Sequence, residues 1–536
     1  MSSGNKPVIL ILGASQMQLP AISIGKELGW TVIVADANPK APGVSLSDFF
    51  EHVDLKDLEG MTAAARRHQE IRGLDGVFTA GTDFSATVAW VAEQLGLPGI
   101  PYETALDASD KERMRRVFER AGLPSPRFVT ISSGTDIDAL ELPLVIKPAD
   151  SMGSRGVRKV DTEADLGEAI ADALELSISG RVVVEEYIDG PEFSLDALVY
   201  EGGISLCGAA DRHIFFPPYF VEMGHTMPSD LPQPDLRKVI DLFFDGIRAL
   251  GITEGAAKGD IKLSHTGPVI GEIAARLSGG YMSGWTYPYS SGIRVTEAAM
   301  RIAVGLAPGP LEPVKNCTSA ERAFISIPGV IASVSPIQKE QTGIRDIFYR
   351  VKSNDEVRFP SNNIEKCGNV IAVDQDREKA VERAERACRE VFLRLKPCKP
   401  QTADFIFGDS SDRVPDAFKL ADPGNIERYK TMPALFGTLP EAARSKKVAE
   451  LPGLDRELST DWHGEAISTA FARVLEITRF DGVSACRELE SGPAVGGLFW
   501  RAFLRGGLQG GVWLLDTLSM CVSNEILCRE VESWLS

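Results

Sequence analysis

Two carboxylates and an arginine are spaced so that a β-hairpin would gather them on one face. Residues 259–280 read GDIKLSHTGPVIGEIAARLSGG, with apolar residues alternating on either side of a central HTG. A three-residue hairpin loop with glycine in the left-handed position fits these letters. This loop would set Ser264 against Pro268, and therefore Asp260 directly against Glu272. Opposed carboxylates destabilise a sheet unless a cation neutralises them, and Mg²⁺ commonly binds one or two carboxylates together with substrate phosphates.

Arg276 follows Glu272 on the same face of this hairpin, just before a flexible SGG. Lys258 and Lys262 share that face by the two-residue period of a strand, so the carboxylates could instead belong to a surface charge ladder. These residues alone leave both interpretations open, and the rest of the chain must decide between them.

The bulk composition is that of an ordinary globular protein with several domains. The chain has 536 residues, 44% of them hydrophobic and 25% charged, a length that predicts about three to four domains. A net charge of −18 argues against nucleic acid or an anionic membrane surface as the main partner. The eight cysteines form no CxxC pair and no zinc-type spacing.

No stretch of the chain predicts a membrane or secretory segment. The first residues, MSSGNKP, lack the basic and apolar regions of a signal peptide. Residues 492–522 are apolar, but Arg501, Arg505 and Asp516 interrupt them, which predicts one or two buried helices instead of a membrane span. We therefore expect a cytoplasmic protein, and a homodimer is left open.

The N-terminal region alternates strands with helices, which predicts a parallel α/β sheet. The predicted strands and helices are Val8–Leu12, 19–28, Thr31–Ala35, Gly76–Ala80 and Ser85–Leu95. Ligands of such sheets lie at the carboxyl ends of the strands, where Ser15, Gln16, Asp36, Thr82 and Asp83 would sit. Because only the first glycine of a G-x-G-x-x-G pattern is present, a dinucleotide site is a weak interpretation.

A second group of segments would suit a nucleotide phosphate. Lys111 opens a helix capped by Asp110, and the strand Leu144–Lys147 leads into the loop DSMGSRGV at 150–157. A small-residue loop with two glycines lets backbone N–H groups surround phosphate oxygens. It is not a Walker A loop, and a plain glycine-bearing hairpin is the competing interpretation.

Two further stretches carry groups that could read a nucleotide or a substrate. The predicted strand 181–186 ends in EEYI at 185–188, and Glu192 follows, so this stretch could contact adenine and ribose or be merely an acidic strand pair. The segment 207–230 is rich in proline and aromatic residues and contains His213, Glu222 and His225, plausible substrate contacts, although a structural role is commoner for a single histidine.

Taken in order, these pieces resemble the ATP-grasp superfamily over about residues 8–395. The branch it is similar to is that of the carboxylate–amine ligases, which includes D-alanine–D-alanine ligase, with biotin carboxylase and carbamoyl phosphate synthetase as relatives. PYFVEMGH at 218–225 and EIAARLSGG at 272–280 are similar to bacterial L-amino acid ligases in particular. The resemblance implies a multidomain α/β and α+β ATP-grasp fold.

The resemblance also implies roles for individual residues. Asp260 and Glu272 would bind Mg²⁺, with Mn²⁺ as an alternative, and Arg276 would stabilise the acyl phosphate and the tetrahedral intermediate. Substrate contacts, implied less directly, would come from Glu222, His225, His213, Ser15 and Gln16. The residues around ATP would be Lys111 and Lys147, the phosphate loop Gly153, Ser154, Gly156 and Val157, the adenine hinge Glu185, Tyr187 and Ile188, and Glu192 on the ribose.

One position departs from the family pattern. The family usually has asparagine two residues after the second metal carboxylate, where this chain has Ala274. Its loss implies one metal contact fewer, a replacement by water, or a weakened metal site.

The implied activity is ATP-dependent joining of a carboxylate, expected to be an amino acid, to an amine, with release of ADP and phosphate. Activation of bicarbonate or formate is an alternative, and so is a nucleotide-binding protein without activity. The resemblance implies three domains: 1–104 (α/β, preceding the core), 105–310 (ATP-grasp core with a lid lobe at about 125–200) and 311–395 (a small β-rich lobe). Beyond it, residues 396–415 are rich in Pro, Ser and Asp, which predicts a linker, and the pattern of 416–536 predicts a mostly helical domain.

Overall fold

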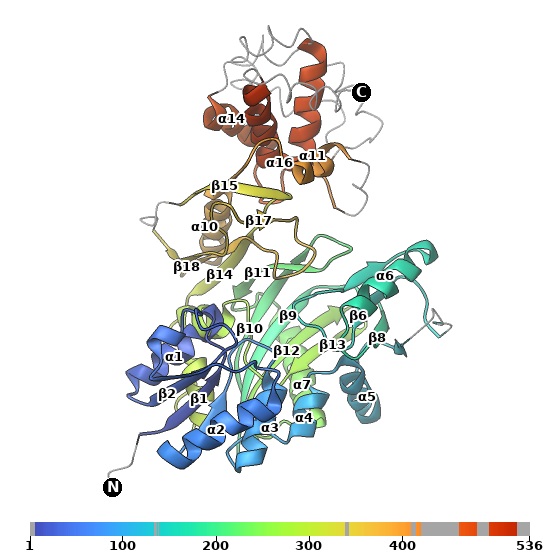
Figure 1. Ribbon diagram of the computed structural model, residues 1–536. Helices are drawn as coiled ribbons and strands as arrows, with labels where there is room; N and C mark the ends of the chain where they lie inside the picture. Colours follow the sequence, from blue (N-terminus) through green and yellow to red (C-terminus); the bar gives the residue numbers. More distant parts are fainter. Residues whose placement is uncertain are drawn as a thin grey trace. The chain divides into compact units, whose positions relative to one another are not determined.

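The computed structural model describes residues 6–132, 137, 139–337, 342–408, 414–419, 460–479 and 492–521. The chain divides into two compact units. The first comprises 1–215, 222–321 and 371–381, and the second comprises 216–221, 322–370 and 382–536. Figure 1 shows the elements of both units along the chain.

The first unit begins with the predicted parallel sheet. Its strands lie in the order β3-β2-β1-β4, and all pair in parallel. They are β1 (Val8–Leu12), β2 (Thr31–Ala35), β3 (Phe49–Glu51) and β4 (Gly76–Phe78). The last strand ends two residues before the predicted Ala80, which instead forms an isolated parallel bridge with Leu277. The loop after β4 is thereby tied to the segment that carries Arg276.

Helices cover both faces of this sheet, as alternating side chains of β1 show. Ile9 and Ile11 pack with α1 (Leu19–Glu27) and α9 (Val295–Ala303). Val8, Leu10 and Leu12 pack with α2 (Leu58–Arg72) and α3 (Ser85–Leu95) on the other face (Figure 1). All five β1 residues are therefore buried, which explains why this strand reads as a continuous apolar run.

A large antiparallel sheet forms the centre of the first unit. Seven of its eight strands hold residues of the first unit, and these follow the order β13-β12-β9-β10-β11-β14-β18. They are β9 (Glu192–Tyr200), β10 (Gly203–Phe215), β11 (Val221–Met227), β12 (Gly255–Ser264), β13 (Gly267–Ala274), β14 (Thr318–Phe324) and β18 (Gly368–Asp374). Strands β11, β14 and β18 also hold residues of the second unit. Odd-numbered residues of β9 pack against α5 (Lys111–Ala121) and α7 (Gln233–Leu250), so Ser194 and Asp196 face the opposite side.

The predicted hairpin is present, but its turn is one residue shorter than expected. Ser264 pairs with Gly267, and Leu263 pairs with Pro268, so the predicted pairing of Ser264 with Pro268 is wrong. A β-bulge between Asp260 and the next residue inserts Gly271 and shifts the register back. Asp260 consequently does pair with Glu272, as predicted. The shorter turn and the bulge each shift the strand pairing by one residue, and the two shifts cancel at Asp260 and Glu272.

A four-stranded antiparallel sheet makes up the region of the predicted lid lobe. Its order is β5-β8-β6-β7, with β5 (Phe128–Ile131), β6 (Leu144–Pro148), β7 (Arg158–Val160) and β8 (Val182–Glu186). Helix α6 (Glu163–Glu175) packs on it through a small apolar core. The glycine loop connects β6 to β7, and the shorter elements of the unit are α4 (Tyr102–Asp107) and α8 (Tyr287–Ser290).

The second unit combines a small sheet with helices. Its elements are β15 (Gly329–Ser335), β16 (Ile344–Tyr349), β17 (Glu356–Val357), β19 (Phe392–Leu395), α11 (Pro400–Phe407), α14 (Ile467–Thr478) and α16 (Gly492–Cys521). Helix α16 is kinked at Gly507, in line with the predicted one or two helices.

Two stretches in and next to the second unit have structure that the sequence analysis did not anticipate. Helix α10 (Arg377–Glu390) is followed by apolar residues that pair with β15 as β19. The predicted linker 396–415 contains α11, and much of the predicted helical region 416–536 lies outside the described residues. The bounds of the four predicted domains and of the linker between the last two stay a prediction.

A membrane span finds no support among the helices of the described residues. None of them is both long and apolar enough to cross a bilayer.

Candidate active site

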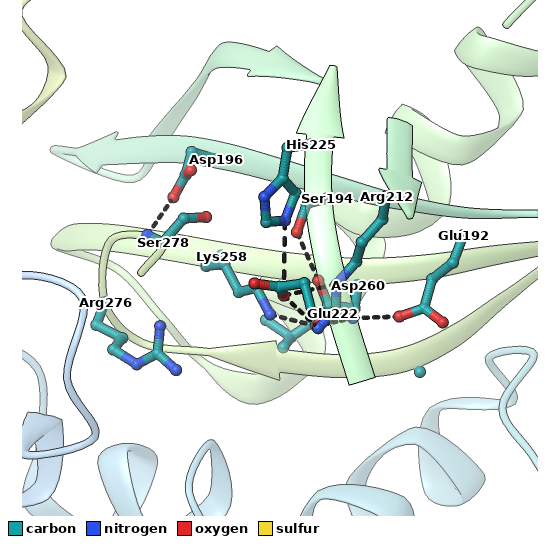
Figure 2. A network of polar contacts seen from close by, with 12 residues as sticks. Glu192, Ser194, Asp196, Arg212, Glu222, His225, Lys258, Asp260, Arg276 and Ser278 are labelled. Atoms are coloured by element: carbon teal, nitrogen blue, oxygen red, sulfur yellow. Dashed lines mark hydrogen bonds and ion pairs between the residues drawn. The ribbon is translucent and has the colours of Figure 1, made fainter. Parts of the chain in front are cut away.

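The carboxylate of Asp260 lies in a dense, buried polar cluster on the face of the central sheet opposite α5 and α7. Asp260 is 5% exposed, and its carboxylate accepts a hydrogen bond from Ser194 Oγ at 2.7 Å. It also pairs with Lys258 Nζ and with Arg212 Nη1, the latter at 2.8 Å. Figure 2 shows these side chains converging from neighbouring strands. The sequence left two interpretations of this carboxylate open, a metal site and neutralisation by the neighbouring lysines, and the contact with Lys258 belongs to the second.

Lys262, the other lysine of the supposed ladder, points elsewhere. Its Nζ donates to the carbonyl oxygen of Ile188 at 2.9 Å and lies 3.9 Å from Glu192. It also lies 5.1 Å from the ring centroid of Tyr187. Lys262 therefore supports the predicted adenine and ribose residues, and a continuous ladder of alternating charges along β12 does not form.

Glu272 is surrounded by cations. Burial alone would raise the pKa of Glu272, but the nearby positive charges outweigh burial and lower this pKa from 4.5 to about 2. In order of effect, the charges belong to Lys111, Lys258, Arg276 and Lys147. Residues from four separate segments thus surround one carboxylate, which stays ionised at neutral pH.

Arg276 is held by the loop that follows β4. Its Nε donates to Asp83 Oδ1, and its Nη1 donates to the carbonyl oxygen of Leu277 at 3.0 Å. Burial lowers the pKa of this guanidinium, but Asp83 and the site carboxylates more than offset this and raise it. The same loops approach through glycines, since a Cβ on Gly81 would lie 3.0 Å from the Cα of Gly279. The N-terminal sheet therefore helps to position Arg276.

Glu185 and a backbone carbonyl hold the two lysines that were predicted to bind ATP. Lys147 Nζ lies 2.6 Å from Glu185, and Arg115 Nε donates to the same carboxylate at 2.8 Å. Burial lowers the pKa of Lys147, and Glu185 only partly opposes this shift. Lys111 Nζ donates to the carbonyl oxygen of Ser151 at 2.6 Å, at the start of the glycine loop. The Glu185 side chain thus holds Lys147, while the adenine hinge prediction rests on Tyr187 and Ile188.

The glycine loop has a left-handed backbone at three of its residues. Gly153, Ser154 and Gly156 have φ values of 66°, 61° and 70°, a region that glycine adopts without strain. A Cβ on Gly156 would lie 2.9 Å from Pro148 Cγ, so this position requires glycine. Val157, the fourth predicted residue, donates its N–H to the carbonyl oxygen of Ser154 at 3.2 Å.

Arg212 gathers three carboxylates that were predicted for different tasks. It pairs with Glu192 and Asp260, and it binds Glu222 Oε2 through Nε at 3.1 Å and Nη2 at 2.8 Å. Burial lowers the pKa of Arg212, but the charges of these acids raise it well above its usual value. Figure 2 shows His225 standing beside Glu222 on the same side of the sheet.

Three of the predicted substrate residues are not drawn into this cluster. His213 Nε2 contacts Thr226 Oγ1 at 2.9 Å. Ser15 and Gln16 are exposed at the carboxyl end of β1. Beyond the predicted set, the structure adds Asp83, Arg115, Arg212, Lys258 and Glu321 as contacts of site residues. Three of these had a sequence signal, since Asp83 follows a strand end, Lys258 shares the hairpin face and Arg212 lies in the segment 207–230. Arg115 and Glu321 had none.

The donors around Asp260 and Glu272 suit Mg²⁺ bound together with phosphates. Two opposed carboxylates are present, and one is held ionised, which matches the usual protein contribution to an Mg²⁺ site. Among the described residues, no three His, Cys, Asp or Glu side chains gather as a metal site of their own. Ala274, where asparagine was expected, pairs across the hairpin with Lys258. The protein therefore supplies two carboxylates as ligands and places the positive charge of Lys258 beside them. Most ligands of a bound Mg²⁺ would come from substrate and water.

Two family models match separate stretches of the chain. Residues 140–284 match the ATP-grasp domain, and residues 323–396 match the L-amino acid ligase C-terminal domain 2. The first match contains Lys147, the glycine loop, both hairpin carboxylates and Arg276.

Comparisons with individual proteins agree with these matches. Carnosine synthase 1 of Gallus gallus is 25% identical over 62% of this chain and 40% of its own length. A D-alanine–D-alanine ligase of Marinobacter nauticus is 35% identical over 29% of this chain and 51% of its own length. The chain thus spans only about half or less of these two relatives. The structure of an L-amino acid ligase from Bacillus licheniformis aligns over 74% of this chain and 100% of that one, with a TM-score of 0.65 and 21% identity.

The chain therefore has an ATP-grasp domain followed by a C-terminal domain of the L-amino acid ligase type. The predicted fold class and the predicted resemblance are both confirmed.

Proposed function

We propose that this protein is an ATP-dependent ligase that activates an amino acid carboxylate as an acyl phosphate and joins it to an amine. The observation that carries the proposal is the register of the β12–β13 hairpin. It opposes Asp260 and Glu272 and surrounds Glu272 with four cations. Such an arrangement suits a polyanionic substrate and the charge that phosphoryl transfer moves.

The first half of the reaction is a problem of positioning and charge. A carboxylate is a poor acyl donor, so it must first receive the γ-phosphoryl group of ATP. Lys111, Lys147 and the N–H groups of the 153–157 loop would hold the phosphates in line with the acid. Mg²⁺, held by Asp260, Glu272 and the phosphates, would neutralise the negative charge that builds up during transfer.

In the second half an amine attacks the acyl phosphate. Arg276, oriented by Asp83, would balance the negative charge on the carbonyl oxygen as the C–N bond forms. No protein nucleophile is required by this route. Movement of the glycine loop over the phosphates would keep water from hydrolysing the intermediate.

Hydroxylamine provides the test, because it captures acyl phosphates as hydroxamates. The protein is incubated with ATP, Mg²⁺ and hydroxylamine, first with pooled amino acids and then with bicarbonate or formate. Amino acid hydroxamates together with ADP support the proposal. ATP consumption only with bicarbonate or formate would replace it with a carboxylase-like function, and ATP binding without phosphate release from any pool would contradict both.

The metal ligands have their own test. Glu272→Gln should abolish most of the Mg²⁺-dependent turnover. An unchanged dependence of turnover on Mg²⁺ in this variant would show that the carboxylate pair does not bind the metal.

A further inference from the structure

A buried histidine stands between two carboxylates next to the turn that carries Arg276. His225 on β11 is 2% exposed, and its Nδ1 lies 3.1 Å from Oε2 of Glu321. Glu321, on β14, is itself 0% exposed. A carboxylate at this distance accepts a hydrogen bond from Nδ1–H, so it fixes the tautomer in which Nε2 carries the lone pair.

The other ring nitrogen faces Glu222, which Arg212 joins to Asp260. His225 Nε2 lies 3.6 Å from Oε2 of Glu222. Gly280 closes the turn after Arg276, and a Cβ there would lie 3.1 Å from His225 Cε1 and 2.9 Å from Glu222 Oε1. The imidazole therefore lies against the turn that follows Arg276.

The charged groups around this imidazole come from three strands. Glu222 lies on the same strand as His225, Glu321 faces the imidazole from β14, and Arg212 on β10 binds Glu222. The 278–280 turn presents backbone and a serine. With Nδ1–H directed at Glu321, Nε2 is the ring nitrogen that can accept a proton.

The second half of the proposed reaction needs such an acceptor. An amino acid amine is mostly protonated at neutral pH, and an ammonium group has no lone pair with which to attack. Resting on the proposed function above, we propose that His225 is the general base that deprotonates the attacking amine, and that Glu321 is the residue that positions it.

The proton and electron balance of this step is simple. The ammonium proton passes to Nε2 of His225, and the freed lone pair attacks the carbonyl carbon of the acyl phosphate. The C–N bond forms, the C–O bond to phosphate breaks, and phosphate leaves with the electron pair. The remaining excess proton on nitrogen is lost to the departing phosphate, and His225 returns its proton to water.

Hydroxylamine separates this role from a structural one, because it is largely unprotonated at neutral pH and needs no base. For Glu321→Gln at pH 7, with pooled amino acids, we expect hydroxamate formation within about twofold of wild type. Dipeptide formation without hydroxylamine should fall about 10- to 100-fold, at the lower end of what general base catalysis contributes. Raising the pH should restore dipeptide formation, since the amine then arrives deprotonated.

A second variant and a matched control complete the experiment. His225→Asn should show the same split between the two products. Glu51→Gln removes the carboxylate from another His–Glu pair, with His68 at 2.8 Å in the N-terminal region, and should change neither product. Equal loss of hydroxamate and dipeptide in both Glu321→Gln and His225→Asn would overturn the proposal while leaving the ligase function intact. Absence of hydroxamate with the wild-type protein would overturn the ligase function itself.

Discussion

Replacing Glu272 by glutamine should destabilise the protein in the absence of ligands. Metal-binding carboxylates often repel one another when the metal is absent, so their removal usually relieves strain. Here the opposite sign is expected, because Glu272 is half-buried among four cations that lower its pKa from 4.5 to about 2. The variant would leave Lys111, Lys147, Lys258 and Arg276 without that counter-charge.

The size of the effect follows from the pKa. A fall from 4.5 to about 2 is equivalent to about 3 kcal/mol of preferential stabilisation of the ionised form. Because Glu272 is not fully buried, solvent screening reduces this value, and we expect Glu272→Gln to cost about 1–3 kcal/mol. Because the pKa of Glu272 is lowered in the folded protein, its contribution to stability depends on pH. The contribution is complete above about pH 4.5 and is lost as the pH falls toward 2.

Urea unfolding of wild type and variant without ATP or Mg²⁺ measures this difference. The midpoint of the transition should be lower for Glu272→Gln at pH 7, and the gap between the two proteins should narrow as the pH is lowered from 5 toward 3. A variant that is more stable than wild type at pH 7 would refute the reasoning, since repulsion between Asp260 and Glu272 would then dominate the site.

Two further predictions concern residues that hold the catalytic groups. Glu185→Gln leaves two buried cations without their carboxylate, so the free energy of unfolding should fall by about 3–5 kcal/mol. The KM for ATP should also rise, because Lys147 loses the carboxylate that holds it. As a control, Asp235→Asn removes an exposed ion pair and should change the free energy of unfolding by less than about 1 kcal/mol. Asp83→Ala frees Arg276 from the loop after β4, so kcat should fall about tenfold or more while the KM for ATP changes little. Asp83→Glu should recover part of the rate. An unchanged kcat in Asp83→Ala would show that Arg276 does not depend on Asp83.

Much of the fold could be predicted because its signals are local. The buried strand β1 reads as five apolar residues, and α5 begins after Asp110, whose carboxylate accepts the N–H of Arg113 as a helix cap. The stretch after α10 shows the limit. Residues 392–395 continue an apolar helical pattern in sequence, but pairing with β15 makes them a strand, and that partner lies far away in the chain.

The candidate site was located from the sequence although part of the predicted strand pairing in the hairpin was wrong. Neither the two-residue turn nor the bulge at Gly271 was predicted, yet Asp260 opposes Glu272. Contacts between distant segments had no comparable signal. Asp83 and Arg276 are 193 residues apart in sequence, and His225 and Glu321 are 96 apart. Periodicity cannot pair such residues, because their proximity depends on how whole sheets pack.

The fate of the carboxylate oxygen tests the central claim most directly. The amino acid that gives the strongest hydroxamate is prepared with ¹⁸O in its carboxylate and incubated with ATP, Mg²⁺ and amine. Transfer of the γ-phosphoryl group to that carboxylate requires the released phosphate to carry one ¹⁸O atom for each product molecule. Release of unlabelled phosphate alongside the product would contradict acyl phosphate formation and with it the account of this site.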